Sequence, residues 1–270
     1  MKKLLLAFQF LTIVPVKVRG DVSEEEMTGS AMYFPVVGAF QGLLIALSAI
    51  LLIKVLSPEI TAGMVLFILI LSNGGFHLDG LADTFDAMAV KSSGNTETDR
   101  QKRLSVMKDS STGAIGTIAI AMTILLKFLL LKNVLTYSIL PISLSFLFLA
   151  PVFSKWVMVP AMYHGSSARK DGLGRMFIGN ISTNILLLST LLVTLIFIAV
   201  AKIYILGAYK AGCIKLFLIF LITSYLFSFI SVKFADWRFG GLTGDNLGAI
   251  SELSENIFLM VVSIWLRHSF

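Results

Sequence analysis

Long apolar segments constrain this chain more than any other feature of its sequence. A helix needs about 20 apolar residues to cross a bilayer. Charged residues make up 14% of the chain, against about 25% in a soluble domain, and the mean hydropathy is +0.87. The sequence is therefore that of an integral membrane protein. The expected spans are roughly 34–56, 60–78, 112–131, 135–162, 181–206 and 212–232.

The pattern within these runs indicates helices and excludes a β-barrel. Alternating segments of about ten residues, which mark barrel strands, are absent. A shorter apolar end, 256–266, continues a helix that we expect to begin near Thr243. Leu4–Val16 is too short to cross and no cleavage site follows it, so it predicts an interfacial or re-entrant helix. We expect one membrane-embedded catalytic domain over 1–270, an all-α polytopic membrane bundle of six to seven transmembrane helices.

Basic residues fall mainly on one side of the expected bundle. Crossing at each run places 17–33, 79–111, 163–180 and 233–255 on the same side, with twelve Lys and Arg residues against six on or near the other side. The positive-inside rule makes the richer side cytoplasmic, as in a cell inner membrane protein. The net charge of +6 is thereby attributed to topology, and no nucleic acid partner is expected. Nearly every acidic residue lies on this side, so we expect an active site facing the cytoplasm.

The segment "GGFHLDGLADTFDA" (Gly74–Ala87) carries three carboxylates and no basic residue. In a helix, Asp79, Asp83 and Asp86 project within about 60° of one another, where like charges destabilise the helix. A divalent cation is the simplest neutralising partner, because Mg²⁺ binds carboxylates and completes its ligands with water and substrate phosphates. These aspartates are therefore candidate metal ligands. A solvated helix face at the membrane boundary is the alternative.

His77 lies about 160° round the same helix from Asp79. It is better placed to contact a neighbouring helix or a substrate than to share the metal. We take it as a candidate substrate-binding residue.

The segment "RLSVMKDSSTGAIG" (Arg103–Gly116) precedes the run 112–131. Ser110–Thr112 are N-cap candidates, and a helix N-terminus attracts anions. Lys108 and Arg103 are therefore candidate phosphate contacts. The alternative is a plain helix cap with topology charges.

The segment "FGGLTGDNLGAISELSE" (Phe239–Glu255) sets Asp245, Glu252 and Glu255 on one helical stripe. It predicts a second carboxylate wall that faces the Asp79 helix, with Glu252 as a candidate substrate-binding residue. Solvent-facing acids on the last helix are the alternative.

A basic loop, "ARKDGLGRMFIGN" (Ala168–Asn180), supplies Arg169, Lys170 and Arg175 between glycines. Guanidinium groups and backbone amides of this kind bind phosphate oxygens. With a carboxylate-bound Mg²⁺, the loop points to transfer of a phosphate ester at the membrane surface. One aspartate not bound to metal would take the proton of the attacking hydroxyl.

An ion-coupled transporter is the competing class. Its ion-binding acids are expected near the midplane, in paired broken helices of two halves. Here the acids fall at span ends on one side, which favours the enzyme.

Several of these motifs resemble those of the adenosylcobinamide-GDP ribazoletransferase family, also called cobalamin synthase or cobalamin-5'-phosphate synthase. The resemblance covers nearly the whole chain. The motifs "YFPVVGAFQG", "GGFHLDGLADTFDA" and "GGLTGDNLGAISELSE", in this order and spacing, are very specific. One departure is Ala87, where the family usually has Gly, and it leaves the carboxylates unchanged. The motifs are "FQFLTIVPV", "YFPVVGAFQG", "GGFHLDGLADTFDA", "MKDSSTGAIG", "GLGRMFIGN" and "GGLTGDNLGAISELSE".

The resemblance implies a membrane enzyme that transfers the cobinamide phosphoryl group of adenosylcobinamide-GDP to α-ribazole or its 5'-phosphate, releasing GMP. It implies Mg²⁺, with Mn²⁺ as an alternative, at Asp79, Asp83 and Asp86. Asp109 and Asp245 match the other acidic motifs of the family, and we take both as candidate catalytic residues that support the metal or act as the general base. The lipid bilayer is a further partner, and a homo-oligomer or association with other cobalamin-assembly enzymes is compatible with it.

The motifs alone define only a membrane Mg²⁺-dependent phosphotransferase acting on a nucleotide diphosphate. Phospholipid synthases of the CDP-alcohol type also use spaced aspartates, with an Arg after the alanine of their motif. Here Ala82 is followed by Asp83, which counts against that alternative.

Overall fold

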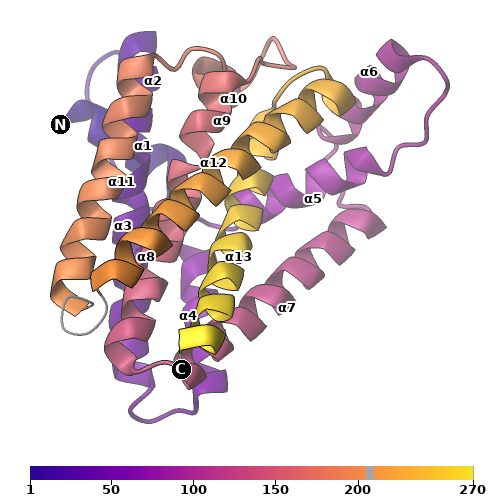
Figure 1. Cartoon of the computed structure of the whole chain (residues 1–270). Helices are drawn as coiled ribbons and strands as arrows, with labels where there is room; N and C mark the ends of the chain where they lie inside the picture. Colours follow the sequence, from indigo (N-terminus) through magenta and orange to yellow (C-terminus); the bar gives the residue numbers. More distant parts are fainter. Residues whose placement is uncertain (205–209, 270) are drawn as a thin grey trace.

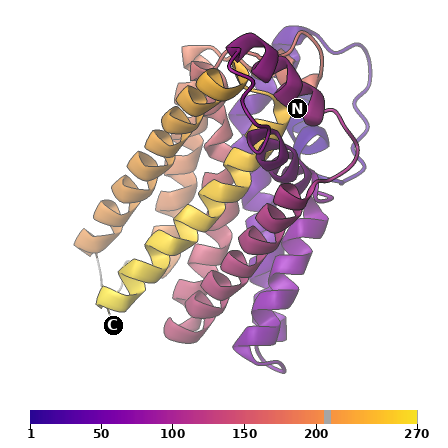
Figure 2. The same ribbon diagram turned by 90° about the vertical axis from the view of Figure 1, so that its right-hand side faces the viewer.

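The computed structural model of the protein describes residues 1–204 and 210–269, and within these ranges it contains helices and no β-strand (Figures 1 and 2). This confirms the all-α prediction. The helices are α1 (Lys2–Leu11), α2 (Glu24–Ser30), the 3₁₀ turn η1 (Ala31–Tyr33), α3 (Phe34–Leu52), α4 (Pro58–Ser72), α5 (Phe76–Met88), α6 (Thr96–Val106), α7 (Ala114–Tyr137), α8 (Leu140–Trp156), α9 (Met158–His164), α10 (Leu173–Phe177), α11 (Thr183–Tyr204), α12 (Lys210–Phe239) and α13 (Gly244–Ser269).

Six helical segments of the described chain are long and apolar enough to cross a membrane, and one bent pair raises the number to seven. The prediction of six to seven spans is confirmed. The end of the predicted span 181–206 lies outside the described residues. The six segments are Glu24–Leu52, Ala114–Tyr137, Leu140–His164, Thr183–Lys202, Ile214–Phe239 and Gly244–Arg267.

The bent pair, α4 and α5, corrects the expected single span over 60–78. The first helix ends at Ser72, and α5 leaves it at 86°. Gly74 and Gly75 make this bend with φ of 65° and 76°, a left-handed conformation that a side chain disfavours. The Oδ1 of Asn73 accepts a hydrogen bond from the Gly75 amide at 2.9 Å. The acidic motif therefore begins a separate helix.

The core of the bundle is built around α8. Of its most apolar window, 94% is buried, against 22% for α11 and α12, whose remaining faces suit lipid. Gly38 and Gly42 of α3 let the two backbones touch: a Cβ at Gly42 would lie 2.1 Å from the Phe148 carbonyl oxygen. Small residues four apart are the usual means of close helix packing in membranes.

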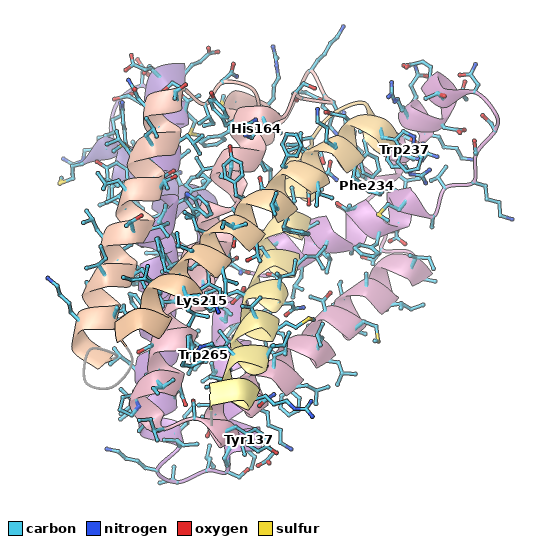
Figure 3. All side chains as sticks on the ribbon, viewed as in Figure 1. Tyr137, His164, Lys215, Phe234, Trp237 and Trp265 are labelled. Carbon is cyan, nitrogen blue, oxygen red and sulfur yellow. The ribbon has the colours of Figure 1, made fainter. Side chains whose placement is uncertain are left out.

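Polar segments gather at one end of the bundle, which carries α2, α6, α10 and the start of α13 (Figure 1); we call it the charged end. The C-terminus lies at the other end. Trp237 lies near the charged end and Tyr137 near the opposite end (Figure 3), and both are largely exposed. Aromatic side chains at both ends of a bundle are typical of the membrane interfaces.

The N-terminal segment predicted over Leu4–Val16 is helical only over Lys2–Leu11. It is attached to α2, since the Lys2 Nζ lies 2.7 Å from a Glu26 oxygen. α2 begins with a capping box formed by Ser23 and Glu26, which fixes its first turn.

Candidate functional site

Contact between α5 and α13 brings the two acidic motifs together, as the sequence predicted. A Cβ at Gly80 would lie 2.7 Å from the Asp245 carbonyl oxygen, and one at Gly248 would lie 3.2 Å from the Cα of His77. Only glycine permits backbones this close. The glycines of both motifs thus place Asp245 beside the helix that carries Asp79 and Asp83.

A short pairing of two loops positions the basic residues of the site. The Leu242 amide donates to the Ser166 carbonyl at 2.7 Å, and the Ala168 amide donates to the Leu242 carbonyl at 2.9 Å. The loop before α10 is thereby attached to the loop before α13. As a result the Arg169 Nη2 lies 3.1 Å from Asp245 Oδ2.

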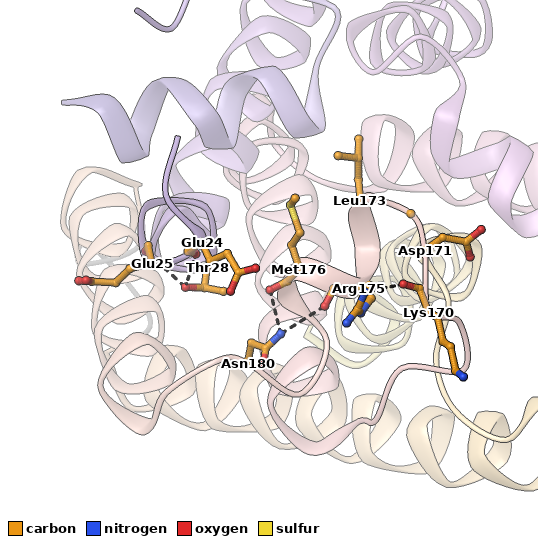
Figure 4. A pocket seen from close by; sticks show the side chains of 10 residues that line it. Glu24, Glu25, Thr28, Lys170, Asp171, Leu173, Arg175, Met176 and Asn180 are labelled. Carbon is orange, nitrogen blue, oxygen red and sulfur yellow. Dashed lines mark hydrogen bonds between the residues drawn. The ribbon is translucent and has the colours of Figure 1, made fainter. Parts of the chain in front are cut away.

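A cavity of about 570 Å³ lies at this junction, at the charged end. Its lining includes His77 from α5, Arg169 and Arg175 from the loop and α10, and Asp245 from α13. A second cavity, of about 750 Å³, adjoins it and also contains Arg175 (Figure 4). The two share the segment 171–173 and Arg175, so together they offer room for more than one ligand.

Arg169 has hydrogen-bonding capacity left over. Its side chain is 17% exposed and its Nη2 is paired with Asp245, but its buried Nε has no hydrogen-bond partner among the described residues. Buried donors of this kind are normally satisfied. A phosphate oxygen in the cavity would satisfy them.

The aspartates of α5 differ in their surroundings. Asp79 is exposed and Asp83 is half-buried, and the charges of Asp79 and Asp245 both act on Asp83. Among the described residues, no group of three or more His, Cys, Asp or Glu side chains is arranged to hold a metal ion. Mg²⁺ is nevertheless commonly held by one or two carboxylates, with water and substrate phosphates as its other ligands. Asp79 and Asp83 fit that requirement in donor type; they lie beside the cavity, next to Asp245, and do not line it.

Asp86, the third predicted metal ligand, is used differently. Its two oxygens accept hydrogen bonds from the amides of Gly113 and Gly116 at 2.7 and 2.8 Å. It therefore caps the N-terminus of α7 from another helix. The N-cap expected at Ser110–Thr112 is wrong, because α7 starts at Ala114 with Gly113 as its N-cap.

Lys108 lies at the rim of the two cavities, and Asp109 lies outside both of them. The Lys108 Nζ is 2.8 Å from Asp171, a residue that lines both cavities. Asp109 accepts hydrogen bonds from the hydroxyl and amide of Ser111, which lower its pKa. It does not line the cavity, so the structure does not bring this candidate catalytic residue to the site.

Two predicted substrate contacts are corrected. Arg103 is 4% exposed and donates to the Arg238 carbonyl at 3.1 Å, so it stabilises the end of α12. Glu252 is 3% exposed and lies 2.5 Å from the Lys127 Nζ. Both side chains are already paired inside the protein, which leaves neither free for a substrate.

Lys127 and Lys155 are the buried charges that the sequence analysis missed. Both lie inside segments that we assigned as apolar spans, Lys127 in 112–131 and Lys155 in 135–162. Lys127 pairs with Glu252 and also, at 3.2 Å, with Glu255. The available signal was a lysine in the middle of a span together with two glutamates on the last helix, because charges within a membrane need partners.

Fold and site together define a polytopic helical membrane protein with a cavity at its charged end, lined by arginines and carboxylates. The sequence matches the family described as cobalamin-5-phosphate synthase over residues 3–263. The chain belongs to this family and is a membrane enzyme.

Curated relatives agree with this assignment. The chain is 35% identical to the adenosylcobinamide-GDP ribazoletransferase of Thermodesulfovibrio yellowstonii, over 98% of this chain and 99% of the relative. It is 32% identical to the proteins of the same name from a Thermoanaerobacter species, over 94% of each chain, and from Geotalea daltonii, over 95% of each. No solved structure matches the chain.

Proposed function

We propose that the protein transfers the cobinamide phosphoryl group of adenosylcobinamide-GDP to α-ribazole or its 5'-phosphate. A ribose hydroxyl of the acceptor attacks the phosphorus that carries cobinamide. The bond from this phosphorus to the bridging oxygen breaks, and GMP leaves with that oxygen. The product is adenosylcobalamin or its 5'-phosphate, joined by a phosphodiester, and one proton is lost from the hydroxyl.

The observation that carries this proposal is the cavity lined by Arg169, whose Nε is a donor without a partner among the described residues. A diphosphate concentrates negative charge, and guanidinium groups bind phosphate oxygens in a fixed geometry. Arg169 and Arg175 both line the cavity and together would hold the two phosphates of the donor. Asp245 keeps Arg169 oriented through the contact at 3.1 Å.

Asp79 and Asp83 would hold Mg²⁺, or Mn²⁺ in its place, and the ion would neutralise the diphosphate and the departing phosphate. The carboxylates of α5 have no ion pair among the described residues, which supports this assignment. Asp245 lines the cavity and would accept the proton of the attacking hydroxyl.

The charged end faces the cytoplasm of the inner membrane in this proposal. The excess of Lys and Arg at this end supports that orientation. A reporter fused after Ser93 should be active in the cytoplasm; a periplasmic signal would reverse the topology.

The test of the function is release of GMP by purified protein given adenosylcobinamide-GDP and α-ribazole, with and without a chelator. We expect GMP only when both substrates and the divalent ion are present. Arg169→Gln should raise the KM for the donor. Arg19→Gln is the matched control and should leave this KM unchanged, because Arg19 lines neither cavity. Absence of GMP in the complete reaction would reject the proposal.

A further inference from the structure

A buried lysine contacts His77, one of the residues that line the cavity. Lys155, in α8, is 1% exposed, and no carboxylate among the described residues forms an ion pair with it. A charge in this position is costly unless it is well hydrogen-bonded. Its neighbour Lys127 has two glutamate partners, so Lys155 is the less expected of the two.

The contacts of Lys155 are two neutral groups. Its Nζ donates to the Ser251 hydroxyl at 3.0 Å and lies 3.1 Å from the His77 Nδ1. The Ser251 hydroxyl also contacts the Ser154 hydroxyl at 2.8 Å, and both serines are fully buried. The amine is therefore held from two sides, and it is aimed at one particular nitrogen of the imidazole.

An ammonium group carries three hydrogens and no lone pair, so it can only donate. The His77 Nδ1 must then accept, which leaves the ring hydrogen of a neutral imidazole on Nε2. His77 lines the cavity. No other hydrogen-bond partner of His77 is found within residues 1–204 and 210–269, so Nε2 is free to meet a ligand.

We propose that Lys155 is a positioning residue: it fixes His77 as the Nε2–H tautomer, so that the imidazole donates a hydrogen bond to a phosphate oxygen of the donor diphosphate. The inference rests on the proposed function for the identity of this ligand. A neutral donor serves here because it adds a hydrogen bond next to carboxylates without requiring another buried positive charge. Gly248 permits this arrangement of the two helices, since its lack of a Cβ lets α13 pass close to the backbone of His77.

The tautomer can be read without substrate. The chain has three histidines, so ¹⁵N-labelled histidine gives few side-chain signals, and a His77→Ala variant identifies those of His77. We expect a protonated Nε2 and an unprotonated, hydrogen-bonded Nδ1 in the wild type. Lys155→Met should replace this signature by a mixture of the two tautomers. An unchanged signature in Lys155→Met would overturn the proposal.

Turnover provides the second readout. Lys155→Met and His77→Ala should each lower kcat/KM for adenosylcobinamide-GDP by about 10- to 100-fold, the usual effect of losing an orienting partner. The double variant should be no slower than His77→Ala, and the KM for α-ribazole should stay unchanged. Multiplying effects would mean that Lys155 acts independently of His77, which would also overturn the proposal.

Ser251→Ala tests the same proposal if Lys155→Met does not fold. It removes one of the two contacts of Lys155 and leaves the amine in place, so partial loss of the tautomer signature is expected. A signature that is intact in this folded variant counts against positioning. If the wild type releases no GMP but its tautomer depends on Lys155, the proposed function fails while the positioning role stands.

Discussion

Two clusters of charge share helix α13, where they lie on neighbouring stretches, and they differ in how far their groups are satisfied. The buried cluster consists of Lys127, Glu252 and Glu255, and both glutamates of α13 lie within 3.2 Å of the Lys127 Nζ in α7. The cavity cluster consists of Asp245 and Arg169, which line the cavity, and of Asp79 and Asp83 beside it, and it contains a buried donor without a partner, the Arg169 Nε. The fully paired charges stabilise the fold, whereas the incompletely paired ones belong to the proposed substrate site.

The difference arises from depth along α13. Asp245 lies in the first turn of the helix, at the charged end. Glu252 lies seven residues further on, about 10 Å along the axis, where the side chain is buried among helices. Two carboxylates on the same stripe of α13 therefore have different surroundings. Asp245 lines the cavity, whereas Glu252 pairs with a buried lysine.

The largest expected effect is on the cavity cluster. Asp83→Asn keeps the shape of the side chain but removes its charge, and with it the proposed hold on Mg²⁺. Turnover should fall by about 10³-fold, since metal stabilisation of a phosphoryl transition state is worth several kcal/mol. The measurement is GMP release under saturating substrates.

Thermal unfolding of the same variant is the control. Asp83 has no ion pair among the described residues, so its removal should leave stability unchanged or raised. Near-normal turnover would remove Asp83 from the metal site, and a large loss of stability would move it into the structural cluster.

The buried cluster should show the reverse behaviour. Lys127→Met leaves two glutamates buried without a cation, a change that typically costs about 3–5 kcal/mol. Lys132→Met is the matched control, because its pair with Glu59 at 3.2 Å is exposed and such pairs are worth at most about 1 kcal/mol. Unfolding in detergent would compare the two variants, and equal losses would contradict the contrast between buried and exposed pairs.

Much of the fold could be predicted from the sequence because apolar runs determine where helices cross. The glycine pair at Gly74 and Gly75 also marks a turn, which the expected single span over 60–78 did not take into account, but nothing local sets the direction of α5. That direction is determined by packing against α13, because Gly80 of α5 lets the backbone of α13 approach to contact distance.

For the site, the sequence identified which motifs meet but not which side chains remain free. Arg103 and Lys108 belong to one basic segment, yet one is buried against α12 and the other is exposed at the rim. Helical spacing cannot show this, because burial depends on elements far away in the chain. Lys155 was missed for a related reason: a single lysine barely alters the hydropathy of its span.

A smaller effect tests which cluster Asp86 belongs to. If it caps α7, as its contacts with the amides of Gly113 and Gly116 indicate, Asp86→Ala should cost about 1 kcal/mol of stability and reduce turnover only modestly. The variant is measured by unfolding and by GMP release. Loss of turnover comparable to that of Asp83→Asn, with stability unchanged, would instead assign Asp86 to the metal.

The smallest effect concerns a satisfied carboxylate outside the membrane. Asp99, in α6, accepts hydrogen bonds from the hydroxyl of Ser92 at 2.5 Å and from the amide and hydroxyl of Ser93 at 2.7 and 2.8 Å. These bonds lower its pKa to about 2, below the value of about 3.9 of an unfolded chain. The folded state therefore favours the charged form. Its contribution to stability is fully present above about pH 4 and is lost as the pH falls through about 2.

Asp99→Asn should remove this dependence. The difference in unfolding temperature between wild type and variant should be constant above about pH 4 and shrink between about pH 4 and 2. Asp21→Asn, an exposed aspartate, is the matched control and should show no such change. A difference that stays constant down to pH 2 would mean that the serines do not distinguish the charged form of Asp99. The hydrogen bonds from the two serines, together with the longer contact of 3.8 Å to Arg103, would then be insufficient to hold this carboxylate ionised.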